Sequence, residues 1–114
     1  MEKIVRQAYL YDFYGELLTD HQKRIYEEAV LNDLSPSEIA KEIGISRQGV
    51  FDMIRRCDKI LNDYENKLHL LERFLKNREK IRKICDLSQE KQEDAAKTLS
   101  VIHMIASEIM EESY

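Results

Sequence analysis

The side chains best suited to chemistry in this sequence are the hydrogen-bonding and basic ones that recur between residues 46 and 59. Arg and Gln can pair with base edges, whereas Arg and Lys can contact phosphates. A serine at a helix start can hold a phosphate together with free backbone N–H groups. The candidate nucleic-acid contacts are Ser46, Arg47, Gln48, Phe51, Asp52, Arg55, Arg56 and Lys59. Asp52 and Asp58 offset part of the positive charge, so we expect a single chain to bind nucleic acid weakly.

A second basic tract follows at residues 67–83, where seven basic residues against two acidic ones give a net charge of +5. Residues 86–114 have two basic and seven acidic residues, a net charge of −5. This distribution favours an anionic partner for the basic tract, such as an RNA duplex contacted through its shape and phosphates. The alternative is an exposed helix whose charge the acidic segment neutralises. The candidate residues of this tract are Arg73, Lys76, Arg78, Lys80, Arg82 and Lys83.

Contacts of this kind need a rigid support, and the residues around Arg47 predict a helix-turn-helix. Ser35 is expected to cap the first helix of the pair, with Glu38 completing a capping box. Gly44 is expected to end that helix in the left-handed conformation. Ser46 then caps the second helix, which would carry the candidate contacts.

The small and apolar residues of the same segment fit this prediction. Ala40 is small where the two helices must approach closely, and Ile45 can fill the space beneath the turn. Val50 would face the first helix. This order of residue types is what a short helix-turn-helix requires, and it places the motif at residues 34–59.

The rest of the chain also predicts helices, because 114 residues include only three Gly and one Pro. We therefore expect an all-α fold, with residues 1–114 forming a single helical domain. Thr19 or Asp20 should cap the second helix, and Ser88 the last one. The expected parts are helices near 3–17 and 20–31, a helix-turn-helix core at 19–59, a long-helix extension at 60–85, and an amphipathic C-terminal helix at 88–112.

The helix that begins at Ser46 has no Gly or Pro after Gly49, so it is expected to run to about residue 75 or 85. Apolar residues along it alternate spacings of four and three, which is the heptad pattern of a helix that packs against another helix. The sequence leaves open whether this seam pairs with a second chain or with the C-terminal helix. The residues assigned to a dimer seam are Ile54, Leu61, Tyr64, Leu68, Leu71 and Leu75.

Several classes of function are not expected. Three scattered glycines cannot form a Gly-rich phosphate loop, and the three histidines lack metal-ligand spacing. No nucleophile is paired with a base, so we predict neither an enzyme nor a bound cofactor. Cys57 and Cys85 both lie in apolar-periodic stretches and are predicted to be buried thiols. Without a signal-peptide core or an apolar run of ~18 residues, a cytoplasmic location without membrane contact is expected.

The segment LSPSEIAKEIGISRQGVFDMIRR resembles the DNA-recognition region of sigma factors of the region-4 type. The chain is more similar still to the YlxM-like family of small bacterial proteins. That resemblance also includes YLYDFYGELLTDHQ near the N-terminus and LLERFL in the long helix, whereas the acidic C-terminal segment is less distinctive.

The resemblance implies an all-helical fold with a helix-turn-helix and a homodimer. It also implies a link to the signal recognition particle, through that particle's protein or its small RNA. The expected role is therefore that of a nucleic-acid-binding accessory or regulatory factor, with DNA or RNA as its ligand. The alternatives are a protein-interaction module that modulates a partner, and a DNA-binding transcription regulator.

Overall fold

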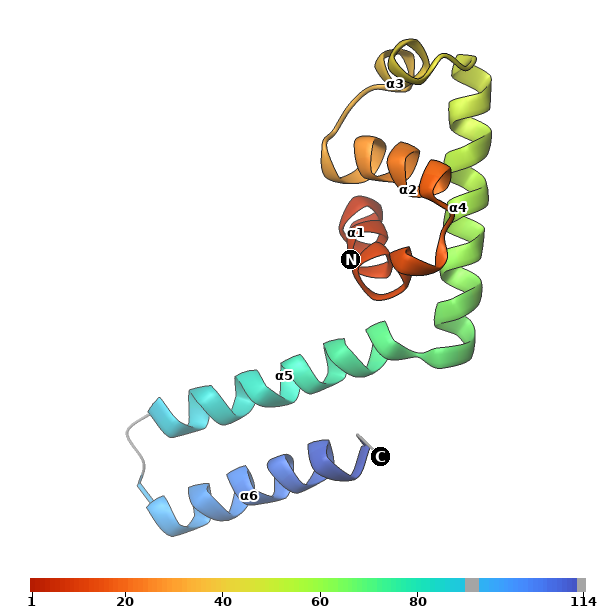
Figure 1. Cartoon of the computed structure of the whole chain (residues 1–114). Coiled ribbons are helices and arrows are strands. Elements are labelled where there is room, and N and C mark those ends of the chain that lie inside the picture. Colours follow the sequence, from red (N-terminus) through yellow and green to blue (C-terminus); the bar gives the residue numbers. More distant parts are fainter. Residues whose placement is uncertain (90–92, 113–114) are drawn as a thin grey trace. The chain divides into compact units, whose positions relative to one another are not determined.

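The computed structural model describes residues 1–89 and 93–112, and these residues form helices joined by short connections, with no strand among them (Figure 1). The predicted all-α class is confirmed. The chain divides into two compact units, Met1–Leu71 and Glu72–Tyr114. The boundary falls within the segment 60–85 that the sequence assigned to a long-helix extension.

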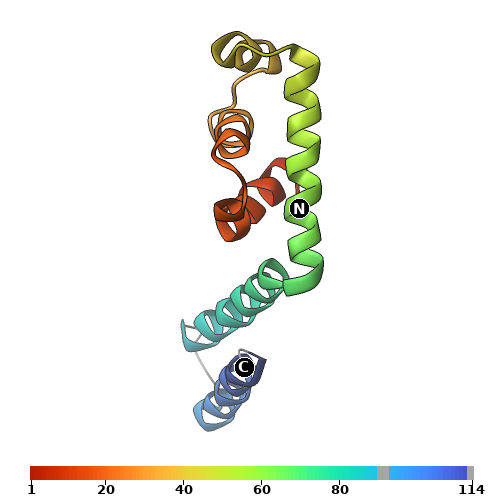
Figure 2. The same cartoon turned by 45° about the vertical axis from the view of Figure 1, so that its right-hand side comes forward.

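The first unit consists of three short helices packed along one long helix. Figures 1 and 2 show α1, α2 and α3 following one another along one side of α4, with α3 at the end where α4 begins. Helices were predicted near 3–17 and 20–31, and both are confirmed, each with an irregular last turn. The elements are α1 (Lys3–Tyr14), the 3₁₀ turn η1 (Gly15–Leu17), α2 (Asp20–Tyr26), the π-helical turn η2 (Glu27–Leu31), α3 (Pro36–Ile43) and α4 (Arg47–Leu68).

Local side-chain bonds fix where α2 and α3 begin. The Thr19 hydroxyl accepts a hydrogen bond from the Gln22 N–H at 3.2 Å, and the Gln22 side chain accepts one from the Thr19 N–H at 2.9 Å. The cap of α2 is therefore Thr19 and not Asp20. The Ser35 hydroxyl accepts from the Glu38 N–H at 3.2 Å, which confirms Ser35 as the cap of α3. Each cap satisfies backbone donors that have no partner within the helix.

Three fully buried side chains hold α2, α3 and α4 together. Ile25, Ile39 and Val50 are each 0% exposed, and they come from α2, α3 and α4 respectively. Burial of each such side chain stabilises the fold by roughly 1.5–3 kcal/mol. Partly buried apolar residues surround this cluster: Ala29, Leu34, Ala40, Ile43, Ile45, Met53 and Ile54. Both helices of the predicted motif thus share one apolar core.

A polar network centred on Asp58 joins α1 and α2 to α4. The Asp58 carboxylate accepts from the Tyr26 hydroxyl at 2.5 Å and from the Gln7 amide at 3.0 Å. The Asn62 amide donates to the Asp58 carbonyl at 2.8 Å, while Arg6 donates to the Asn62 side-chain oxygen at 3.1 Å. Because Tyr26 is fully buried, its desolvation and its bond to Asp58 raise its pKa above the ordinary value.

The prediction that α4 continues to residue 75 or 85 is wrong. The helix is long, at 22 residues, but it ends at Leu68. His69 then adopts the left-handed conformation, with φ = 57°, and donates its N–H to the Glu65 carbonyl at 2.8 Å. A new helix, α5 (Leu70–Gln89), begins directly afterwards. A residue other than Gly or Asn is uncommon at such a helix end, because its Cβ opposes the left-handed conformation.

The break is stabilised by two side chains that capture the first N–H groups of α5. The Tyr14 hydroxyl accepts from the Leu70 N–H at 3.1 Å and donates to a Glu65 carboxylate oxygen at 2.7 Å. The same carboxylate oxygen accepts from the Leu71 N–H at 2.9 Å. Glu65 is only 5% exposed, so these bonds replace the water that its charge would otherwise need.

The predicted heptad seam is therefore interrupted, and much of it packs within the chain itself. Leu61 and Leu71 are buried in the first unit, at 0% and 1% exposed. Ile54 belongs to the helix-turn-helix core, and the Tyr64 ring stacks on that of Tyr14 at 6.0 Å between centroids. Leu68 is exposed, and Leu75 lies beyond the break in α5. These positions do not form one continuous stripe for pairing with a second chain.

The second unit contains the part of α5 from residue 72 onward and α6 (Ala95–Glu112), which run antiparallel as a helical hairpin (Figure 1). Lys80 joins them, since its ammonium lies 2.8 Å from a Glu112 oxygen and 3.5 Å from a Glu108 oxygen. The hydrogen bond between Lys80 and Glu112 raises the pKa of Lys80 and lowers that of Glu112. The predicted amphipathic C-terminal helix is thus present.

Two local predictions for this part of the chain are wrong. Ser88 does not cap the last helix, because α5 continues through Gln89 and the Ser88 hydroxyl donates to the Cys85 carbonyl at 2.8 Å. Asp94 has the capping position, with a carboxylate oxygen 3.1 Å from the Lys97 N–H. Cys85 is exposed, whereas Cys57 is buried as predicted, and burial raises the Cys57 pKa to about 11.

Candidate nucleic-acid interface

The turn between α3 and α4 is held by backbone bonds and a serine cap. Gly44 has φ = 81°, the left-handed conformation predicted for it, and the N–H groups of Gly44 and Ile45 both donate to the Ala40 carbonyl, at 2.9 and 3.2 Å. The Ser46 hydroxyl accepts from the Gly49 N–H at 2.9 Å. A Cβ on Gly49 would lie 3.1 Å from that hydroxyl, so glycine leaves room for a close cap. The first turn of α4 is thus fixed in position.

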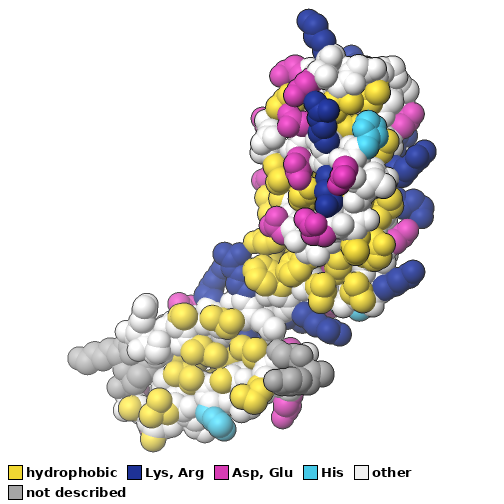
Figure 3. Space-filling view, in the orientation of Figure 1, with side chains coloured by type: hydrophobic (Ala, Val, Ile, Leu, Met, Phe, Trp, Pro, Cys, Tyr) yellow, Lys and Arg dark blue, Asp and Glu magenta, His cyan; other side chains and the backbone are white. Residues whose placement is uncertain are grey.

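All eight candidate contacts are exposed, and α4 with its cap Ser46 places them on one side. Gln48, Asp52, Arg55 and Lys59 are spaced by four, three and four residues, so they form a single row. The other candidates flank this row: Ser46, Arg47, Phe51 and Arg56. Figure 3 shows Lys and Arg side chains projecting along the edge of this unit where α4 lies. The structure therefore brings the predicted residues of α4 together.

Residues on this side of α4 already form weak interactions with one another. Asp52 accepts from Gln48 at 3.0 Å and from Arg55 at 3.2 Å. The Arg47 guanidinium lies over the Phe51 ring, 5.6 Å from its centroid, which limits the positions of that cation. The Asp52–Arg55 pair is largely exposed to water, so it contributes at most about 1 kcal/mol and can give way to a phosphate.

In the structure, the acidic residue beside the basic side chains of α4 differs from the one expected from the sequence. Asp58 was expected to offset it, but its carboxylate is turned toward Gln7 and Tyr26 in the interior of the unit. Asp63 takes that place, with a carboxylate oxygen 3.1 Å from the Lys59 ammonium. Sequence reasoning missed Asp63, although its spacing of four residues from Lys59 on a helix indicates such a pair.

The second basic tract lies on α5, and some of its charge is already paired. Lys80 is bound by Glu108 and Glu112, as described above. Lys76 lies 3.4 Å from Glu72, and Arg82 lies 3.4 Å from Glu79. The other members of this tract are exposed, namely Arg73, Lys83 and Arg78, and Arg78 also interacts with another residue. Because of these ion pairs, the positive potential around α5 is weaker than the net charge counted from the sequence would indicate.

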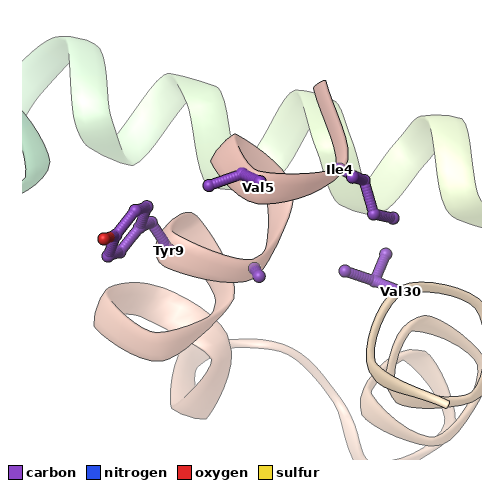
Figure 4. Close-up of a pocket in the computed structure, with 5 residues that line it drawn as sticks. Ile4, Val5, Tyr9 and Val30 are labelled. Carbon is purple, nitrogen blue, oxygen red and sulfur yellow. The ribbon is translucent and has the colours of Figure 1, made fainter. Parts of the chain in front are cut away.

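An open apolar pocket of about 260 Å³ lies between α1 and η2. Figure 4 shows Ile4 and Val30 extending toward each other across it, with Val5 and Tyr9 nearby. Ala8 completes its lining. None of these side chains carries the charge that a phosphate ligand would need, so this pocket adds nothing to the α4 surface.

Comparison with known proteins agrees with this geometry. A family model described as "Putative helix-turn-helix protein, YlxM / p13 like" matches residues 1–102. The chain belongs to the UPF0122 family. The UPF0122 protein YlxM of Bacillus subtilis (strain 168) is 42% identical over 94 residues, covering 82% of this chain and 86% of its own length. A UPF0122 protein of Thermoanaerobacter sp. (strain X514) is 43% identical over 105 residues, covering 90% and 89%.

Membership of the UPF0122 family confirms the expected resemblance and the helix-turn-helix. It is a family described by a binding motif and not by a catalysed reaction. No helix among residues 1–89 and 93–112 combines the length and the apolar character needed to span a membrane. Across the same residues, no three His, Cys, Asp or Glu side chains gather where they could hold a metal ion.

Proposed function

We propose that this UPF0122 protein is a nucleic-acid-binding regulatory factor whose contact surface is the exposed side of α4. The observation that supports this most directly is that the helix-turn-helix holds α4 rigidly and leaves its outer side exposed. A capped turn and a shared apolar core hold α4 rigidly, while its outer side presents only exposed, mostly polar and basic residues. Side chains that only filled a core would not face water in this way.

Each contact residue has a role that follows from its position. Arg47 and Gln48 lie in the first turn of α4, where a helix that enters a groove meets base edges. The first-turn N–H groups beside Ser46 suit a phosphate oxygen. Further along the same side, Arg55 and Lys59 suit the phosphate backbone, as does Arg56 next to them.

The proposal extends to the setting in which the protein acts. The similarity to YlxM-like proteins leads us to infer an accessory role beside the signal recognition particle, in the cytoplasm. Its ligand there would be the particle's RNA or a complex that contains it. The second basic tract on α5 offers a further place for phosphate contact, with Arg73 and Lys83 as its main residues.

Fluorescence anisotropy tests the proposal. The full-length protein is titrated into a labelled signal-recognition RNA of bacterial type and into random duplex DNA of equal length, at two salt concentrations. We expect saturable binding that weakens with salt, because each phosphate contact releases bound counterions. The preferred ligand separates an RNA factor from a transcription regulator.

Charge-reversal variants show whether α4 makes the contact. R47E/R55E/R56E should lose binding, whereas K3E/R24E/K97E changes the net charge equally at exposed positions on other helices and should keep most of it. Absence of binding by the unaltered protein at near-physiological salt would refute the proposal. The helix-turn-helix would then be a scaffold for contacts with another protein.

A further inference from the structure

An open pocket of about 230 Å³ lies on α4, directly after the row of candidate contacts that ends at Lys59. Its lining residues are Ile60, Asp63, Tyr64 and Lys67. Positions that differ by three, four and seven residues are neighbours on one side of a helix, so these four side chains surround a single patch of surface. The pocket lies wholly within the first unit.

The pocket has an apolar wall and a charged rim. Ile60 and Tyr64 are half-buried and form the wall nearer the core. Asp63 and Lys67 are exposed and form the rim. The ring of Tyr64 is held in position because it stacks on that of the fully buried Tyr14, with 6.0 Å between the ring centroids. Tyr14 does not line the pocket, so another part of the Tyr64 ring contributes to its wall.

A positioned aromatic ring, a carboxylate and an ammonium group are the parts that recognise an unpaired base and its phosphate. Aromatic side chains stack on the faces of bases. A carboxylate accepts hydrogen bonds from an exocyclic amino group of a base. Asp63 accepts from Lys59 through Oδ2, and because a carboxylate can accept on both oxygens, Oδ1 can accept from a base. Lys67 suits the phosphate of the same nucleotide.

The charges around the pocket also suit a nucleic acid. Among the exposed residues of α4 from 56 to its end, Arg56, Lys59 and Lys67 are cations, and Asp63 is the one acid. Arg56 precedes Ile60 by four residues, so it lies next to the pocket. A strand bound by the proposed phosphate contacts at 55–59 would thus continue toward a positively charged part of α4.

We propose that this pocket holds the base of an unpaired nucleotide in a bound RNA. The inference rests on the proposed function and narrows its ligand to an RNA with a bulge or a loop beside a helical segment. Side chains cannot read the deep, narrow major groove of A-form RNA, so sequence-specific recognition of RNA depends on bases outside the helix. Asp63 favours adenine, which has an amino group, over uracil, which has none.

Fluorescence anisotropy with two RNA duplexes of equal length tests this inference on the full-length chain. One duplex is fully paired, and the other has a single bulged adenine. We expect the unaltered protein to bind the bulged duplex at least about fivefold more tightly, the lower end of what stacking one base on an aromatic side chain contributes.

Variants of Tyr64 show whether the pocket causes this preference. Tyr64→Leu removes the ring and should abolish the preference, while binding of the paired duplex stays nearly unchanged. Tyr64→Phe keeps the ring and should keep the preference. Tyr9→Leu is the matched control, because Tyr9 is another half-buried tyrosine, on α1 and outside the proposed contact surface. It should behave like the unaltered protein. Circular dichroism checks that the helices persist.

Asp63→Ala gives a second test that remains decisive if Tyr64→Leu loses its helical signal, since Asp63 is exposed and its removal has little effect on folding. A duplex with a bulged adenine is compared with one that has a bulged uracil. The unaltered protein should prefer adenine at least about threefold, within the usual range for one hydrogen bond. Asp63→Ala should lose most of that preference, although it binds both duplexes more tightly because a negative charge is removed.

The outcomes separate this inference from the proposed function. Equal binding of the paired and bulged duplexes by the unaltered protein would overturn the inference and leave the α4 contact surface as proposed. A preference that Tyr64→Leu retains would overturn the assignment of the pocket. Binding of duplex DNA but of neither RNA would overturn the inference alone, whereas binding of none of these nucleic acids would refute both proposals.

Discussion

At the scale of single residues, two tyrosines whose hydroxyls donate to carboxylates, Tyr26 and Tyr11, should make stability depend on alkaline pH. Burial, and then the bond to Asp58, raises the pKa of Tyr26 above its ordinary value of 10.0. Burial and the bond to Glu27 do the same for Tyr11. The folded state therefore keeps these protons at a pH where the unfolded chain loses them. Their contribution to the free energy of unfolding is fully present below pH 10 and declines as the pH rises further, by up to about 1.4 kcal/mol per pH unit for Tyr26 and by less for the half-buried Tyr11.

Denaturation with urea at pH 8, 10 and 11 measures this dependence. Tyr26→Phe should lower the free energy of unfolding by about 1–3 kcal/mol at pH 8, because Asp58 loses a donor. Its stability should then decrease less steeply than that of the unaltered protein above pH 10. Equal slopes for both proteins would show that Tyr26 ionises normally in the folded state. Cys57, with its pKa of about 11, adds the same background slope to both.

Single residues also show where sequence reasoning reaches its limit. The exposure of the eight candidate residues at 46–59 could be predicted, because helical spacing and local polarity identify the outer side of a capped helix. The role of Asp58 could not, since its partners Gln7 and Tyr26 come from α1 and α2. A carboxylate that looks like a surface charge in the sequence is thus a half-buried link between helices, and Asp63 takes its place beside Lys59.

At the scale of elements, the junction between α4 and α5 depends on a buried carboxylate. Glu65→Ala removes the acceptor shared by the Tyr14 hydroxyl and the Leu71 N–H. We expect it to lower the free energy of unfolding by about 1–3 kcal/mol, the usual effect of leaving buried donors unpaired. Glu65→Gln keeps one acceptor oxygen and should have a smaller effect. Urea denaturation followed by circular dichroism measures both.

Lys67→Ala is the control for this junction, because Lys67 is exposed two residues away on α4. It should change the free energy of unfolding by no more than about 0.5 kcal/mol. If Glu65→Ala proved as mild as Lys67→Ala, the captured N–H groups would not be what ends α4.

The same junction explains which elements the sequence could predict. The caps at Thr19, Ser35 and Ser46 involve neighbours within three residues, so a local pattern was enough to place them. The break at His69 has no Gly or Pro to mark it, and it is stabilised by Tyr14, which lies 56 residues from its partner Leu70. A heptad pattern indicates that a stripe is buried but not what buries it, so the helix appeared continuous.

At the scale of the whole molecule, the two units differ in how much apolar surface they bury, and their local stabilities should differ accordingly. α4 carries Val50, Cys57 and Leu61 into the interior of the first unit, all at 0% exposed. Among the described residues of α6, only Ile105 is buried, and it is 8% exposed. Segments with few buried contacts open at lower free energy and exchange their amide hydrogens faster.

Hydrogen exchange followed by mass spectrometry should therefore show strong protection in the middle of α4 and weak protection in α6 at low protein concentration. Exchange in the middle of α4 should be slow because Val50, Cys57 and Leu61 are completely buried there. Protection in α6 that matched that of α4 would mean that the few buried contacts of the hairpin are enough to make it as stable as the first unit.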